Sequence, residues 1–224
     1  MKWESRPYQR AAVNYILSHP SCGLFLDMGL GKTVITLTAL DLLINDYLQI
    51  GKVLVIAPLR VARHTWPEEA KKWDHLKDLR LQVCCGTEAE RKDALSKDAD
   101  VYVINREQVA WLVKYYGKKW PFDMTVIDEL SSFKSPGAQR FRALKKVPGR
   151  VIGLTGTPGN LLDLWAEIYL LDKGKRLGRS ITVYKNLFFT PGARSGHIVY
   201  EWRPKEGAEE EIKKRISDIC ISMN

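Results

Sequence analysis

The sequence has little of what a secreted, membrane-spanning or disulfide-stabilised protein needs. No apolar run approaches the roughly 18 residues of a transmembrane helix, and no apolar core of a signal peptide comes after the first six residues. There are only four cysteines, without a C-x-x-C pair or a metal-ligand spacing: Cys22, Cys84, Cys85 and Cys220. We therefore expect reduced thiols, no zinc site, no membrane partner and a cytoplasmic protein.

Acidic residues are scarce relative to basic ones. The chain has 35 Lys and Arg against 26 Asp and Glu, which leaves a formal net charge of +9. Such a surplus suits a polyanionic partner. The basic residues are spread through the chain, and many intracellular nucleotide-binding proteins are mildly basic. Charge alone favours nucleic acid as a partner and leaves an ordinary basic protein open.

The 224 residues can hold one large α/β domain or a domain with an appendage. Short apolar runs typical of buried parallel strands alternate with helical patterns, which predicts a mostly parallel central sheet with helices on both faces. The expected strands are 22–26, 52–57, 81–84, 101–104, 125–128 and 151–154, and the expected helices include 32–45, 66–73, 88–96, 107–116, 139–146 and 161–171.

The alternation stops after residue 172. Glycines punctuate the rest of the chain, which has one isolated strand pattern at 197–203 and a charged helix pattern at 208–219. We predict a domain over residues 1–172 and a small appendage over 173–224.

One segment has the composition of a phosphate-binding loop. Residues 27–33 read Asp-Met-Gly-Leu-Gly-Lys-Thr, directly after an apolar strand pattern and directly before a helical one. In that context backbone amides and a helix N-terminus can surround phosphates, the Lys32 ammonium can reach them, and the Thr33 hydroxyl can bind Mg²⁺. Leu26 stands where the full motif has its first glycine, so the motif alone is not decisive.

A second segment supplies acid. The strand 125–128 delivers Asp128 and Glu129 to the carboxyl end of the sheet, where such sheets bind ligands. Asp128 is placed to hold Mg²⁺ and Glu129 to act as general base on a water molecule. Together with Lys32, which contributes to catalysis at the phosphates, this pair predicts an ATP hydrolase.

Two further strand ends carry weaker signals. Residues 155–158 read Thr-Gly-Thr-Pro, which is also ordinary turn chemistry. Pro58 and Arg60 come after the strand 52–57, where Arg60 can meet a phosphate backbone or simply begin a solvated helix.

These motifs together resemble the first domain of superfamily-two helicases, which has the RecA-like P-loop three-layer fold. More narrowly they resemble the Swi/Snf family of DNA-dependent ATPases, in the short form of phages and bacteria. The matching segments are 6–9 (Arg-Pro-Tyr-Gln), 27–33, 55–59 (Val-Ile-Ala-Pro-Leu), 128–131 (Asp-Glu-Leu-Ser) and 154–158, within residues 3–172. One departure is Leu130-Ser131, where the family has Ala-His.

The resemblance implies a site for ATP and Mg²⁺. Arg6, Tyr8 and Gln9 bind adenine, with Gln9 reading its edge. The phosphate-binding residues are Met28, Gly29, Leu30, Gly31, Lys32 and Thr33, and Thr33 and Asp128 hold Mg²⁺. Thr155 and Thr157 couple the nucleotide to domain closure. DNA, expected as a duplex held by its backbone, meets Pro58, Arg60, Asn105 and Arg106.

By the same resemblance, ATP is clamped between two RecA-like domains whose closure moves the enzyme along DNA. The second domain, expected in cis or in trans, carries an arginine that completes catalysis, so we expect the chain by itself to be weak or inactive. Two alternatives stay open: a strand-separating DNA or RNA helicase, and a non-enzymatic nucleotide- or DNA-binding module.

Overall fold

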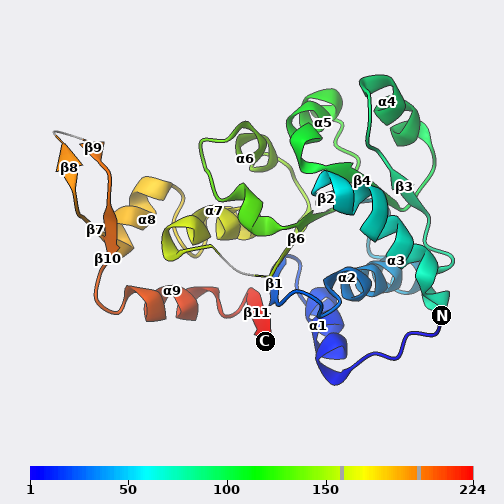
Figure 1. Cartoon of the computed structure of the whole chain (residues 1–224), viewed down its shortest axis with the longest axis horizontal. Coiled ribbons are helices and arrows are strands. Elements are labelled where there is room, and N and C mark those ends of the chain that lie inside the picture. The colour runs from blue at the N-terminus through cyan, green and yellow to red at the C-terminus, as the bar shows by residue number, and fades with distance from the viewer. Residues whose placement is uncertain (157–158, 196–197, 224) are drawn as a thin grey trace.

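The computed structural model describes residues 1–156, 159–195 and 198–223. Its centre is a seven-stranded sheet in the order β11-β1-β6-β5-β2-β4-β3, in which every described strand pair is parallel (Figure 1). In chain order the strands are β1 (Cys22–Leu26), β2 (Val53–Ala57), β3 (Leu81–Val83), β4 (Val101–Asn105), β5 (Met124–Asp128), β6 (Arg150–Thr155) and β11 (Cys220–Met223).

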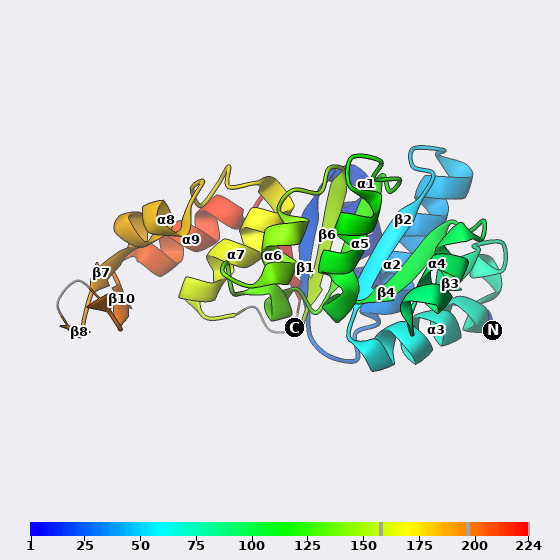
Figure 2. The ribbon, with the colours of Figure 1, turned by 90° about the horizontal axis from the view of Figure 1, so that it is seen from above.

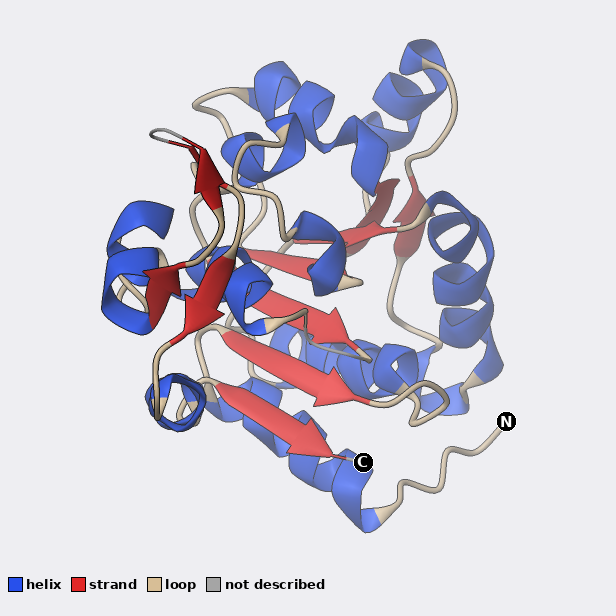
Figure 3. Cartoon of the chain, turned by 60° about the vertical axis from the view of Figure 1, so that its left-hand side comes forward, coloured by secondary structure: helices blue, strands red, loops and turns tan. Residues whose placement is uncertain are grey.

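Helices cover both faces of this sheet, so the predicted three-layer α/β fold is confirmed (Figure 3). The α-helices of the described ranges are α1 (Pro7–Ser18), α2 (Lys32–Asp41), α3 (Trp66–Lys72), α4 (Glu88–Ser96), α5 (Val109–Tyr116), α6 (Gln139–Leu144), α7 (Leu161–Asp172), α8 (Ile181–Phe188) and α9 (Ala208–Ile216). No helix in the described ranges is both long and apolar enough to cross a membrane.

Alternation along each strand creates two cores. In β2, Val53 and Val55 pack with α1, α2 and α3, whereas Leu54 and Ile56 pack with the core of α4 to α9. Successive strand side chains point to opposite faces. Both faces of β2 are therefore covered by helices, and all five of its residues are buried, which explains its continuous apolar run.

The long helix predicted over 32–45 has a different ending. The α-helix α2 stops at Asp41, and the chain continues as a π-helix over Leu42–Asp46. The helix predicted over 107–116 starts instead with a 3₁₀ turn over Arg106–Gln108 before α5.

The single strand predicted at 197–203 is wrong in detail. The described part contains two short strands, β9 (Ile198–Val199) and β10 (Trp202–Pro204), which pair with β8 (Arg194–Ser195) and β7 (Phe189–Pro191). Between them, the amides of Tyr200 and Glu201 both donate to the Ala193 carbonyl. Two residues opposite one form a β-bulge, which bends the hairpin and interrupts the ladder.

The appendage expected after residue 172 projects away from the sheet with α8, α9 and the hairpin strands (Figure 2). Its last strand returns, however. β11 pairs in parallel with β1, with Cys220 opposite Gly23, and becomes the edge of the sheet. The division at residue 172 remains a proposal about domain organisation, but the sheet itself includes residues from beyond it.

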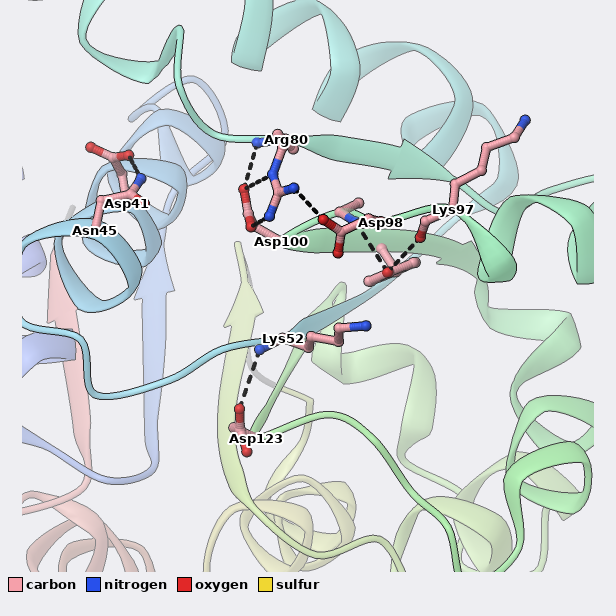
Figure 4. Close-up of polar contacts among 10 residues, drawn as sticks. Asp41, Asn45, Lys52, Arg80, Lys97, Asp98, Asp100 and Asp123 are labelled. Atoms are coloured by element: carbon pink, nitrogen blue, oxygen red, sulfur yellow. Dashed lines mark hydrogen bonds and ion pairs between the residues drawn. The ribbon is translucent and has the colours of Figure 1, made fainter.

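Polar contacts join the loops at the amino ends of the strands (Figure 4). Arg80 pairs with Asp98 and Asp100, and the Asp123 carboxylate accepts from the amides of Gly51 (2.8 Å) and Lys52 (3.2 Å). These contacts lie before β2, β3, β4 and β5. The predicted site residues lie at the opposite, carboxyl edge.

Candidate nucleotide-binding site at the carboxyl edge of the sheet

The phosphate loop (residues 27–33) runs from the end of β1 to the start of α2. Gly29 and Gly31 have φ of 85° and 79°, which L-residues with a Cβ rarely adopt. Leu26, off pattern in the sequence, is still the last residue of β1, and its side chain is fully buried in the core with α2. A leucine is tolerated because the special conformation begins only after it.

Lys32 is the first residue of α2, and its side chain turns back over the loop. Its ammonium donates to the carbonyls of Leu26 (2.7 Å) and Asp27 (3.1 Å). The cation is therefore held where the loop amides and the N-terminus of α2 converge, the position from which a lysine can bind phosphate.

The start of α1 is fastened to the same loop. The Tyr8 hydroxyl (3.2 Å) and the Gln9 amide nitrogen (3.5 Å) both donate to the Leu30 carbonyl, and Gln9 Oε1 accepts from the Arg6 amide (2.9 Å). A groove of about 510 Å³ lies here, lined by residues that include Arg6, Tyr8, Gln9, Gly29, Gly31 and Trp73. Part of its wall comes from the adenine and phosphate segments expected from the sequence, and the rest comes from the first residues of the chain and from α3 and its end.

Asp128 ends β5 as a half-buried residue whose carboxyl group is largely enclosed. Its Oδ2 accepts a hydrogen bond from Trp66 Nε1 at 2.9 Å. Burial raises the pKa of this carboxyl, the Trp66 hydrogen bond and the nearby Lys32 charge lower it, and the Glu129 charge raises it further. The charges of Lys32 and Glu129 both act on Asp128, so the phosphate loop lies near the acid pair (Asp128 and Glu129).

Glu129 points away from its neighbour because its backbone is left-handed, with φ 64° and ψ 60°. This conformation ends the strand and leaves Glu129 exposed, while Asp128 stays enclosed. The Ser131 hydroxyl donates to Glu129 Oε1 at 2.7 Å. Ser131, the departure noted in the sequence, therefore orients the carboxylate that we expect to act as base.

The residues present fit a magnesium ion. Mg²⁺ usually keeps several waters and binds only one or two protein carboxylates beside substrate phosphates. Asp128 offers a carboxylate at the end of β5 within reach of the Lys32 charge, and Thr33 offers a hydroxyl in the first turn of α2. Among the described residues no group of three or more His, Cys, Asp or Glu could form a cage for a metal ion, so a site of the sparse Mg²⁺ type is the one these residues fit.

The segment expected to couple nucleotide and closure leaves β6 beside the phosphate loop. Thr155 is buried at the end of β6. A Cβ built on Gly156 would lie 3.8 Å from Lys32 Nζ and 3.6 Å from Met28 Cγ. Thr157 lies outside the described residues. The chain after β6 therefore passes directly beside Lys32.

The four residues expected at DNA occupy neighbouring strand ends. Ala57 pairs with Asn105, so Pro58 and Arg106 come directly after adjacent strands. Arg60 is exposed, whereas Asn105 is buried and donates to Glu107 at 2.8 Å, and Arg106 donates to the same carboxylate at 3.1 Å. The structure brings the four together but leaves only Arg60 and the rim formed by Pro58 and Arg106 facing outward.

Two site residues were not singled out from the sequence. Trp66 is fully buried in α3, and its link to Asp128 depends on helix packing, for which the sequence carries no signal. Glu167 is fully buried in α7 beside the chain that leaves β6. The sequence did carry one signal for Glu167, because an acidic residue on the apolar face of the helix predicted over 161–171 indicates a buried carboxyl group.

Comparisons with known proteins agree on one family. The profile of the SNF2-related domain matches residues 8–220. "Putative protein p41" of Acyrthosiphon pisum secondary endosymbiont phage 1 is 36% identical over 230 residues, which cover 98% of this chain and 50% of that protein. The Saccharomyces cerevisiae ISWI chromatin-remodeling complex ATPase ISW1 is 31% identical over 178 residues, which cover 74% of this chain and 15% of that protein.

A solved structure gives the same result. The Sulfolobus solfataricus SWI2/SNF2 ATPase core in complex with dsDNA matches with a TM-score of 0.80 and 29% identity, over 100% of this chain and 45% of that one. This chain thus spans about half the length of these two relatives, the phage protein and the archaeal core. With the family profile matching almost the whole sequence, the chain belongs to the SNF2-related domain family.

Proposed function

We propose that this SNF2-family ATPase domain is the ATP-binding half of a DNA-dependent ATPase that couples ATP hydrolysis to movement along duplex DNA. The observation that carries the proposal is the position of Lys32. Its ammonium lies in the phosphate loop, its charge acts on Asp128, and Gly156 passes beside it. Three segments far apart in the sequence thus converge on one cation at the carboxyl edge of a parallel sheet.

The groove beside α1 suits the base and ribose of the nucleotide. Gln9 and Tyr8 hold the Leu30 carbonyl from one side, and Trp3 and Trp73 line the same groove. Adenine binding here would act directly on the phosphate loop, because the residues that touch the base also bind the loop backbone.

The chemistry depends on the acid pair. Glu129 is exposed and oriented by Ser131, so it can take a proton from a water molecule that attacks the terminal phosphate. Lys32 stabilises the charge that develops on the phosphate oxygens. Asp128 and Thr33 would hold Mg²⁺, which when bound neutralises phosphate charge and orients the leaving group.

The DNA part of the proposal is supported by the archaeal relative, whose structure is described as a complex with dsDNA. Arg60 and the strand ends around it lie at the same edge as the nucleotide groove. A second RecA-like domain, in cis or in trans, would close over this edge and contribute the arginine expected from the family resemblance.

The first prediction tests hydrolysis at this site. Glu129→Gln removes the base and keeps the shape, so we expect the hydrolysis rate to fall by roughly 10²–10⁴-fold while ATP affinity changes little. Lys32→Ala should instead weaken ATP binding. Because an absent arginine would slow turnover by roughly 10³–10⁵-fold, rates are measured under single-turnover conditions, with and without duplex DNA.

Glu211→Gln on α9 is the matched control, since Glu211 pairs with Arg215 at 2.7 Å and belongs to neither the phosphate loop nor the acid pair. Hydrolysis that survives Glu129→Gln unchanged would contradict the assignment of the base. ATP binding without hydrolysis in any condition would favour a non-enzymatic nucleotide-binding module. Displacement of one strand from a duplex would favour an unwinding helicase.

A further inference from the structure

We propose that Glu167 of α7 is a positioning residue for ATP hydrolysis, which holds the chain leaving β6 through the amide of Gly159. The proposal rests on the function proposed above, since the chain it holds passes beside Lys32. It assigns a role to a carboxyl group that neither the phosphate loop nor the acid pair uses.

The geometry of the contact is direct. Glu167 Oε1 accepts a hydrogen bond at 3.2 Å from the amide of Gly159, which lies 8 residues earlier in the chain. Gly159 comes directly before Asn160, whose side chain caps α7 by accepting from the Asp163 amide. The connection between β6 and α7 is therefore fastened at its far end by Glu167.

Gly159 lies so close to α7 that a side chain at this position would clash. A Cβ built there would lie 2.8 Å from Glu167 Oε1 and 2.7 Å from Asp163 Cβ. At the near end of the same connection, a Cβ on Gly156 would lie 3.8 Å from Lys32 Nζ. Gly156 and Gly159 are three residues apart in the sequence, so we expect a change in how Glu167 holds Gly159 to act on the chain beside Lys32.

A purely structural role explains Glu167 poorly. The residue is fully buried between Ala166 and Ile168, which are also buried, and its Oε2 has no hydrogen-bond partner within the described part of the chain. Burying a polar atom without a partner costs roughly 1–3 kcal/mol. A leucine would fill this position at lower cost, but it could not hold the Gly159 amide.

Charged groups from several segments act on this carboxyl. Burial, the largest effect, raises the pKa of Glu167 to about 7, and the Gly159 hydrogen bond lowers it. Asp163 on α7 and Glu129 after β5 raise this pKa, whereas Lys134, which pairs with Asp163 at 3.4 Å, lowers it. On β11, Cys220 also lies within electrostatic reach.

The ionised carboxylate is the stronger acceptor, because hydrogen bonds to a charged group are shorter and stronger than neutral ones. The hydrogen bond from the Gly159 amide to Glu167 is therefore stronger at a pH above the pKa of the Glu167 carboxyl than at a pH below it. We therefore expect the contact between Glu167 and Gly159 to be tightest on the alkaline side of neutrality and to weaken as the pH falls.

The contact can be tested without enzymatic activity. In protein labelled with ¹⁵N-glycine, we expect the Gly159 amide resonance to titrate with an inflection near pH 7. Glu167→Gln should abolish the inflection while keeping an oxygen acceptor. Asp163→Asn should move it to lower pH, since the Asp163 charge raises the pKa of Glu167. Glu211→Gln on α9 should leave it unchanged.

Kinetics then test the role in the reaction. Glu167→Leu should lower kcat about 10-fold with KM for ATP within about 2-fold, because the phosphate loop itself is untouched. Glu167→Gln should restore most of kcat and remove the inflection near pH 7 from its pH profile. Should the leucine variant not fold, the glutamine variant carries this test alone.

A Gly159 resonance that does not titrate, or that titrates equally in Glu167→Gln, overturns the contact. A leucine variant with the kcat of the parent protein, or a glutamine variant with an unchanged pH profile, overturns the positioning role. If no form hydrolyses ATP even under single-turnover conditions with duplex DNA, the proposed function fails, and the resonance titration still decides whether Glu167 holds Gly159.

Discussion

At the scale of residues, the acid pair shows how one backbone angle separates two neighbouring carboxylates. Asp128 continues β5 and is enclosed against Trp66, whereas Glu129 adopts a left-handed conformation and turns outward to Ser131. Such a conformation costs roughly 1–2 kcal/mol for a residue with a Cβ. Strain of this kind is typical of functional sites, and here it gives two like side chains different environments.

The second prediction concerns the two glycines of the phosphate loop. Both have positive φ, but a Cβ on Gly29 would meet nothing within 4 Å, whereas one on Gly31 would lie 2.9 Å from Gln9 Nε2. Gly29→Ala should therefore cost only the backbone strain of about 1 kcal/mol. Gly31→Ala should cost about 2 kcal/mol and also weaken ATP binding, because it displaces the Gln9 amide.

Denaturant unfolding and ATP titration of both variants check this prediction. Equal losses of stability and affinity in Gly29→Ala and Gly31→Ala would show that the contact between Gln9 and the loop is unimportant.

At the scale of elements, the return of the chain to the sheet through β11 depends on Arg176. This guanidinium binds both oxygens of Asp218 (2.8 and 2.6 Å), which lies after α9, and also Asp172 at the end of α7 (3.3 Å). The Asp172 side chain is only 1% exposed. Arg176 thus joins the end of α7 to the turn between α9 and β11.

The third prediction is that Arg176→Met destabilises the fold by about 2 kcal/mol, because it leaves the buried Asp172 without its cation. Hydrogen exchange should show β11 losing protection first. Arg203→Met is the control, since Arg203 pairs with Glu201 on the exposed hairpin, and it should cost less than about 0.5 kcal/mol. Protection of β11 that persists in Arg176→Met would contradict the proposed link.

The same network predicts a direction of pH dependence. The hydrogen bond and charge of Arg176 lower the pKa of Asp218. A carboxyl with a lowered pKa in the folded state adds stability above its unfolded pKa and loses it as the pH falls through the folded value. The stability difference between the parent protein and Arg176→Met should therefore shrink in strong acid.

At the scale of the whole molecule, the parallel sheet sorts polar groups to its two edges. At the amino edge, Arg80 pairs with Asp100, and Asp123 accepts from the Gly51 amide (Figure 4). The carboxyl edge carries the phosphate loop, the acid pair and Arg60. The net charge of +9 is available for backbone contacts with a polyanion.

The fourth prediction concerns the use of this charge. Binding to duplex DNA should ignore base sequence and weaken steeply with salt, with a slope of about −0.9 for each phosphate contacted. Arg60→Ala should weaken binding and reduce the slope by about 1. Lys213→Ala on α9, where Lys213 pairs with Glu209 at 2.6 Å, should leave both unchanged. Equal effects of the two substitutions, measured by fluorescence anisotropy at several salt concentrations, would place the DNA elsewhere.

Much of this architecture could be predicted from local pattern. Strand β1, helix α4 and the approximate positions of most other elements agree with their apolar runs, turn residues and spacing. The phosphate loop and the acid pair were predicted because short motifs carry their own backbone requirements. The roles of Trp66, Glu167 and β11 were not predicted. Trp66 binds Asp128 and β11 pairs with β1, and both partners are distant in the sequence. Glu167 is buried in the core, and no local pattern expresses that burial.

The fold class and the residue types expected to bind phosphate and Mg²⁺ could be read from the amino-acid sequence. The alternation of strand and helix patterns and the order of residues within each motif are local properties. Which side chains meet is a property of the folded chain. Folding encloses Asp128 and exposes Glu129, buries Asn105 against Glu107, and aims Glu167 at Gly159. The physical reason is that burial and long-range hydrogen bonds depend on how helices pack across the sheet, and that packing sets the environment of each charge.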